Sequence, residues 1–224
     1  LQIARTATKE CPTSDKLWQA RIVLESQVDS NQVVPTIKAA LDVLPAAKSC
    51  DMWLSLIKAK IQEKVPFNVI LNTCVSAITQ LASIAPVTAG GNRSESVNLA
   101  SRFVCDVFGI LTADSSAFPA TSIRSFSDVA LKRTACCTAE FGALVLSFEQ
   151  QQSPLDMIRI PKIFDKLLEP SAIGQTSPEL WAKYHQFEQL TAHSMPNAAS
   201  IYRKANKILS TPDLRAQFVE LVSN

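Results

Sequence analysis

The residues best suited to chemistry in this sequence are two histidines, six cysteines and a few acids. His185 and His193 are the only histidines, and neither stands at ligand spacing from a cysteine. A structural zinc site needs a tetrahedral set of Cys and His ligands, and the sequence contains no C-x-x-C pair. We therefore expect neither a metal nor a cofactor. We interpret the cysteines as small buried side chains of an intracellular protein: Cys11, Cys50, Cys74, Cys105, Cys136 and Cys137.

Motifs of enzymes are missing from the sequence. It has no G-x-S-x-G, H-E-x-x-H or G-x-G-x-x-G pattern, and Gly90-Gly91 is not part of a phosphate-binding G-x-x-x-x-G-K loop. We predict that the protein is not an enzyme. An enzyme or receptor on an unrelated all-α fold remains an alternative, and a pocket lined by His185 and two acids would favour it.

The basic residues form two small groups in a chain whose net charge is only +2. One group is Lys132-Arg133, and the other is Arg203-Lys204 with Lys207. Nucleic-acid binding usually requires a denser cluster of Lys and Arg. These groups are therefore either solvated helix faces or contacts for RNA or an acidic partner.

The element that positions most of these residues is a helical hairpin over Ser177 to Leu209. Ser177 and Pro178 are suited to start its first helix, and Pro196-Asn197 start its second. Aromatic residues at steps of three share one face of the first helix, and apolar residues at helical spacing form a stripe on the second. The predicted core residues of this hairpin are Trp181, Tyr184, Phe187, Ile201, Tyr202 and Ala205.

The frame of this hairpin recurs along the chain. Trp18 precedes Glu25 as Trp181 precedes Glu188, Trp53 precedes Lys60 at the same spacing, and Phe148-Glu149 ends a copy with Gly142 at the Trp position. We expect the three tryptophans and Phe148 to be core, and the recurring glutamate to form hydrogen bonds within or between helical pairs. The predicted repeats span 14–44, 51–82, 95–131 (degenerate), 134–169 and 177–210, with a terminal helix at 212–222 and loops at 83–96 and 112–122.

This pattern resembles the HAT ("half a TPR") repeat, which is typical of RNA-processing assemblies. The order of motifs from Phe148-Glu149 to Phe218-Val219 is similar to the C-terminal region of a UTP family of small-subunit processome subunits. The resemblance implies an all-α, right-handed superhelical solenoid formed by one array over residues 1–224. It also implies a non-catalytic nucleolar scaffold in pre-18S rRNA processing. Its partners would be WD-repeat propeller proteins and the complex of small nucleolar RNA with pre-rRNA.

Three further expectations concern the context of the chain. A HAT scaffold of another RNA machine, for splicing or mRNA 3′-end cleavage, is the main alternative. The sequence begins at Leu1 and not at Met, so we interpret it as an excerpt or a processed fragment. No apolar run reaches the ~18 to 20 residues that a membrane span needs, and we expect no membrane association.

Overall fold

The computed structural model describes residues 1–83, 98–114 and 117–223, and over these ranges the chain is helical, without a strand. The prediction of an all-α protein is confirmed. No described helix has the length and hydropathy needed to cross a membrane. The α-helices are α1 (Gln2–Glu10), α2 (Asp15–Val28), α3 (Val33–Val43), α4 (Cys50–Gln62), α5 (Phe67–Ala82), α6 (Leu99–Ala113), α7 (Ala120–Ala130), α8 (Ala139–Gln150), α9 (Arg159–Leu167), α10 (Pro178–Gln186), α11 (Met195–Ile208) and α12 (Pro212–Ser223).

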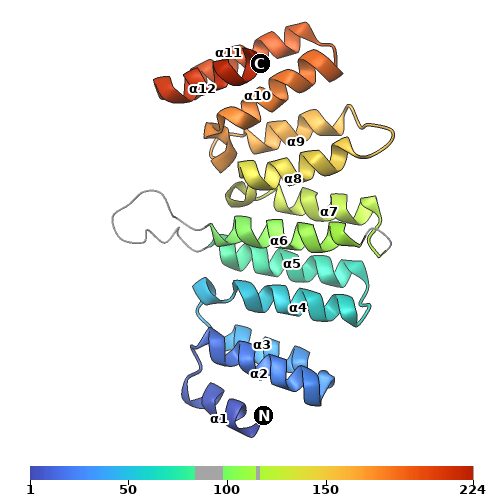
Figure 1. Cartoon of the computed structure of the whole chain (residues 1–224), viewed down its shortest axis with the longest axis vertical. Helices are drawn as coiled ribbons and strands as arrows, with labels where there is room; N and C mark the ends of the chain where they lie inside the picture. Colours follow the sequence, from blue (N-terminus) through green and yellow to red (C-terminus); the bar gives the residue numbers. More distant parts are fainter. Residues whose placement is uncertain (84–97, 115–116, 224) are drawn as a thin grey trace. The chain divides into compact units, whose positions relative to one another are not determined.

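The chain divides into two compact units, a first unit of Leu1–Phe126 and a second unit of Ser127–Asn224. In the first unit each helix from α1 to α6 packs against the next one in sequence, and α4 also contacts α6 (Figure 1). In the second unit α8 packs on α9 and α10, and α10 packs on α11 and α12. In each unit, helices that follow one another in sequence pack together, and some helices also contact the next but one along the chain.

Polar residues at the expected places start several of these helices. The side chain of Ser177 accepts a hydrogen bond from the amide of Leu180 at the start of α10, where Pro178 follows. Thr138 caps α8 in the same way through the amide of Phe141. Such caps satisfy backbone N–H groups that have no partner inside the helix.

The structure corrects the predicted loop 112–122. Thr112 and Ala113 belong to α6, and α7 begins at Ala120. Leu111 is fully buried, and the Thr112 hydroxyl donates to the carbonyl of Phe108 at 2.9 Å. These contacts stabilise the last turn of α6, which therefore extends to Ala113, into the polar segment predicted as a loop. The predicted loop 83–96 lies outside the described residues except for Ser83.

The predicted repeats can be placed on the observed helices. The range 134–169 contains α8 and α9, and 177–210 contains α10, a π-helical turn (Phe187–Thr191) and α11. The range 14–44 contains α2 and α3, 51–82 contains α4 and α5, and the described part of 95–131 contains α6 and α7. One continuous array over residues 1–224 stays a prediction.

Candidate functional site

The recurring glutamate is buried at each of its three positions, and in the first unit it joins three helices. Glu25 on α2 is fully buried. It accepts hydrogen bonds from Arg21 at 3.0 Å and from Arg5 of α1 at 3.2 Å, and the hydroxyl of Thr36 on α3 donates to its other oxygen. Burial alone would raise the pKa of Glu25, but the bonds from Thr36, Arg21 and Arg5 lower it below its usual value.

The equivalent residue of the second unit, Glu149 on α8, is also fully buried. Nε of Arg159 on α9 donates to Glu149 at 2.6 Å, while the other guanidinium nitrogens reach Asp128 on α7 at 2.7 and 3.3 Å and the Ser127 hydroxyl at 3.2 Å. Burial would lower the pKa of Arg159, but the bonds to Asp128 and Glu149 outweigh it and raise the pKa above normal. A permanently charged guanidinium thus joins α7, α8 and α9.

The other two copies show how this contact varies. Glu188 is 4% exposed and accepts a hydrogen bond from Nδ2 of Asn197 on α11 at 3.0 Å. Lys60 on α4 replaces the acid, and its ammonium donates to the Thr73 hydroxyl on α5 at 2.6 Å. All four positions therefore form a side-chain hydrogen bond to the second helix of the pair. The recurrence at this position serves to fix helices on each other.

Two of the three tryptophans fix the chain that enters their helix. Trp18 and Trp181 are buried, and each indole N–H donates to the carbonyl six residues earlier, of Pro12 and of Gln175 respectively, at 2.8 Å. Trp53 is only half-buried, and its indole donates to Gln80 on α5 at 2.7 Å. All three indole N–H groups therefore have protein partners, and burial of the rings of Trp18 and Trp181 favours a packing role for these two.

The remaining predicted core residues are of two kinds. Phe187, Ile201 and Ala205 are buried. Phe148, Tyr184 and Tyr202 are half-buried. The ring of Tyr184 stacks on Phe164 of α9, with centroids 4.6 Å apart, and that of Tyr202 contacts Phe218 of α12 at 5.3 Å. Tyr184 and Tyr202 therefore join the hairpin of α10 and α11 to the helices on either side of it, α9 and α12.

Gly142 stands where the other repeats have Trp, and the structure explains the exchange. An added Cβ at Gly142 would lie 2.7 Å from one methyl of Leu167 and 3.3 Å from a methyl of Leu180. Both leucines are buried, one on α9 and one on α10. The glycine thus lets two neighbouring helices fill the volume that an aromatic ring would take.

The cysteines and histidines do not converge. None of the six cysteines forms a disulfide, and no group of three or more potential metal ligands occurs in the described part of the chain. Burial raises the pKa of Cys50 and Cys137 to about 11 and that of Cys74 to about 12, so these thiols stay protonated at neutral pH. His193 is exposed, and His185 packs edge-on against Tyr202 with centroids 6.0 Å apart.

The predicted basic residues separate into one group on a helix face and one at a groove. Arg203, Lys204 and Lys207 are exposed on α11. Arg133 is exposed after α7, and Lys132 beside it lines a cavity of about 610 Å³ in the second unit.

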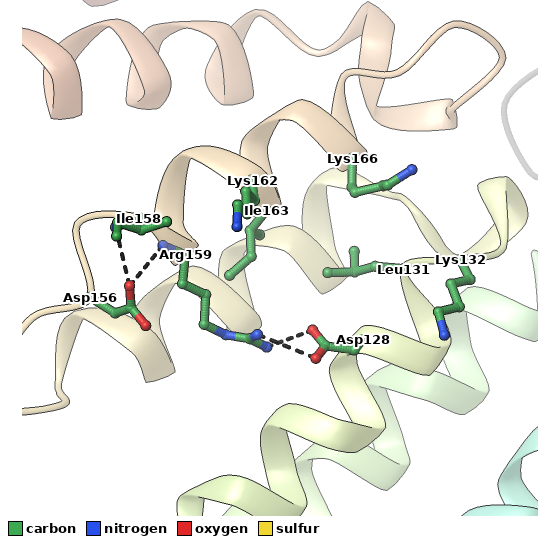
Figure 2. A pocket seen from close by; sticks show the side chains of 9 residues that line it. All are labelled: Asp128, Leu131, Lys132, Asp156, Ile158, Arg159, Lys162, Ile163 and Lys166. Carbon is green, nitrogen blue, oxygen red and sulfur yellow. Dashed lines mark hydrogen bonds and ion pairs between the residues drawn. The ribbon is translucent and has the colours of Figure 1, made fainter.

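This cavity is open to solvent, and we call it the α9 groove. Figure 2 shows its lining side chains, which come from the end of α7, the turn after it, the segment before α9, and α9 itself. They are Asp128, Leu131, Lys132, Asp156, Ile158, Arg159, Lys162, Ile163 and Lys166. Sequence reasoning missed Lys162 and Lys166, although their spacing of four on one helix was a signal that they share a face.

The described residues thus define an all-α protein of packed helical pairs, with a basic groove and buried polar contacts at recurring positions. The model of the family described as "U3 small nucleolar RNA-associated protein 6 C-terminal" matches residues 1–209. This match covers most of the chain, so the chain belongs to that family, and the resemblance to a UTP-family C-terminal region is confirmed. No curated protein gives a significant match to the chain.

Proposed function

We propose that this chain is part of a non-catalytic scaffold subunit of the small-subunit processome, which organises protein partners during pre-18S rRNA processing. The observation that carries the proposal is the family match over residues 1–209, because the family is named for its association with U3 small nucleolar RNA. Such a role places the protein in the nucleolus. Its partners are WD-repeat propeller subunits and the complex of small nucleolar RNA with pre-rRNA.

The helix contacts support a scaffold built as a right-handed solenoid of HAT-type hairpins. Successive helices pack in sequence order within each unit, and every second helix makes contact in the pairs α4 with α6, α8 with α10 and α10 with α12. Stacked hairpins have this contact pattern, and they create extended surfaces on which large partners dock. The handedness and the continuity of the array are parts of this proposal.

The chemistry of the buried polar residues also favours a scaffold over an enzyme. The recurring acids are occupied by hydrogen bonds between helices, as in the contact of Glu149 with Arg159. The raised pKa of Cys74 and of Cys137 disfavours a thiolate nucleophile. Binding surfaces, in contrast, are available on α11 and in the α9 groove.

The test is purification of the tagged chain from nuclear extract, with mass spectrometry of the recovered proteins and sequencing of the recovered RNA. We expect propeller subunits together with U3 small nucleolar RNA and pre-rRNA. Recovery of splicing or 3′-end cleavage factors in their place would assign the chain to another RNA machine. Recovery of no partner at all would contradict the scaffold role.

A further inference from the structure

We propose that the α9 groove binds an acidic protein segment that carries a large apolar side chain. This inference deepens the proposed function, since it names the kind of partner that one surface of the scaffold takes. It concerns only the second unit, because every lining residue lies between Asp128 and Lys166. Three features of the groove carry it: exposed lysines, acids that already accept hydrogen bonds from the protein, and an exposed aliphatic side chain at the rim.

The cations come from two sides of the groove. Lys162 and Lys166 extend from α9, and Lys132 extends from the turn after α7 (Figure 2). All three are exposed, and neither Lys132 nor Lys162 forms an ion pair within the part of the chain that the structure describes. Lys166 pairs with Glu169 at 3.0 Å, but both side chains are about half-exposed, so a partner carboxylate can compete for this ammonium.

The two acids of the lining are already committed to the protein. Asp128 holds the guanidinium of Arg159 at 2.7 and 3.3 Å. Asp156 accepts hydrogen bonds from the amides of Ile158 and Arg159 at 3.1 and 2.8 Å, at the entrance to α9 (Figure 2). Both carboxylates are thus held by groups of the protein, and four cations of the lining, Lys132, Arg159, Lys162 and Lys166, outnumber them, so a ligand meets a positive field.

The apolar part of the groove favours a protein partner over a polyphosphate. Leu131 and Ile163 are buried side chains that reach its wall, while Ile158 is 71% exposed at its edge. A β-branched residue exposed to this extent beside lysines offers contact area for an apolar side chain, as in the anchor residues of protein interfaces. The lining contains no aromatic ring, and single-stranded RNA binding relies on aromatic stacking of bases.

The probe for this proposal is a short fluorescein-labelled peptide in which leucines alternate with glutamates, measured by fluorescence anisotropy on the whole chain. We expect the peptide to bind in low salt, and to bind more weakly when its leucines become serines. The triple variant Lys132→Glu, Lys162→Glu and Lys166→Glu should lose about tenfold or more in affinity. Ile158→Ser should also weaken binding, because it removes the apolar rim without disturbing a buried position.

The control variant carries the same change of charge in the first unit, at Lys9→Glu, Lys16→Glu and Lys58→Glu, and we expect it to bind like the wild type. These lysines are exposed as well, so circular dichroism should show both triple variants folded. Failure of the wild type to bind the peptide would overturn the proposal, as would equal binding by the two triple variants. A uridine oligonucleotide that binds the groove more tightly than the peptide would assign the surface to RNA instead.

The same variants separate this inference from the proposed function. If the wild-type chain purifies with processome components and the groove variant loses one protein among them, both proposals are supported. If the wild type recovers the processome but does not bind the peptide, only the groove assignment fails. If it binds the peptide through these lysines but recovers another RNA machine, the groove stands and the processome role fails.

Discussion

Replacing Arg159 by Met should destabilise the second unit more than replacing its partner Glu149 by Met. Arg159 makes hydrogen bonds of 2.6 to 3.3 Å with Glu149, Asp128 and Ser127, and only 19% of its side chain is exposed. Arg159→Met leaves a fully buried carboxylate without its cationic partner. Breaking a buried pair in this way costs about 3–5 kcal/mol of unfolding free energy.

Glu149→Met leaves a different remainder. Arg159 keeps its two bonds to Asp128, whose side chain is half-exposed, so no buried charge loses all of its compensation. The cost is then close to that of one charged hydrogen bond, about 1.5–3 kcal/mol. In the double variant Arg159→Met with Glu149→Met, no carboxylate is left buried at this site, and we expect it to be more stable than Arg159→Met alone.

The assay is urea unfolding followed by far-ultraviolet circular dichroism, with amide hydrogen exchange to locate the change in α8 and α9. Arg203→Met is the control, because Arg203 is exposed on α11 and should change stability by less than about 0.5 kcal/mol. If the two single variants are equally destabilised and their effects simply add, Arg159 and Glu149 are not coupled. That result would refute the account of the buried glutamate as a contact between helices.

Three further predictions follow from single positions. Gly109→Ala should stabilise the chain by about 0.5–1 kcal/mol, since its added Cβ meets open space. At Gly142 the added Cβ crowds two leucines, and this crowding should cost about 1–3 kcal/mol and cancel the gain. Equal melting temperatures of the two variants would contradict this. Trp181→Ala should lower the free energy of unfolding by about 3–5 kcal/mol. Trp181→Phe keeps a ring and should lower it less, and its difference from the wild type in chemical denaturation includes the lost bond to the Gln175 carbonyl. Burial lowers the pKa of His185, so its contribution to stability should be fully present above the ordinary pKa of about 6.5 and be lost as the pH falls through the lowered value. His185→Phe should therefore make the melting temperature depend less on pH. An unchanged dependence would show that this histidine does not cause it.

The sequence was sufficient for the helices and for the residues that repeat. Helical spacing of apolar residues and the cap at Ser177 predicted the hairpin that α10 and α11 form, because local signals control where helices start and which face they bury. The polar run after Leu111 misled the assignment of a loop. There the helix continues because Leu111 is buried and the Thr112 hydroxyl bonds to the Phe108 carbonyl, and neither effect can be read from the spacing of apolar residues.

The candidate groove could not be predicted in the same way. Lys132 was found as one half of a basic pair. Lys162 and Lys166 line the same groove only because the fold brings α9 and the segment before it close to the end of α7. Asp128 and Asp156 would have argued against an anion-binding surface from sequence alone. Both carboxylates are held in hydrogen bonds, by Arg159 and by backbone amides, and only the folded arrangement shows these bonds.

Departures from the repeat frame are compensated by neighbours, and this decides how much a motif can predict. At Lys60 the acid is replaced by a cation, yet the hydrogen bond to the second helix persists. A hydroxyl can both donate and accept: that of Thr36 donates to Glu25, and that of Thr73 accepts from the Lys60 ammonium. At Gly142 the lost ring is replaced by leucines from two other helices. A search for identical residues misses both copies. A search for what each position must do, which is to fill a volume or to complete a bond between two helices, recovers them.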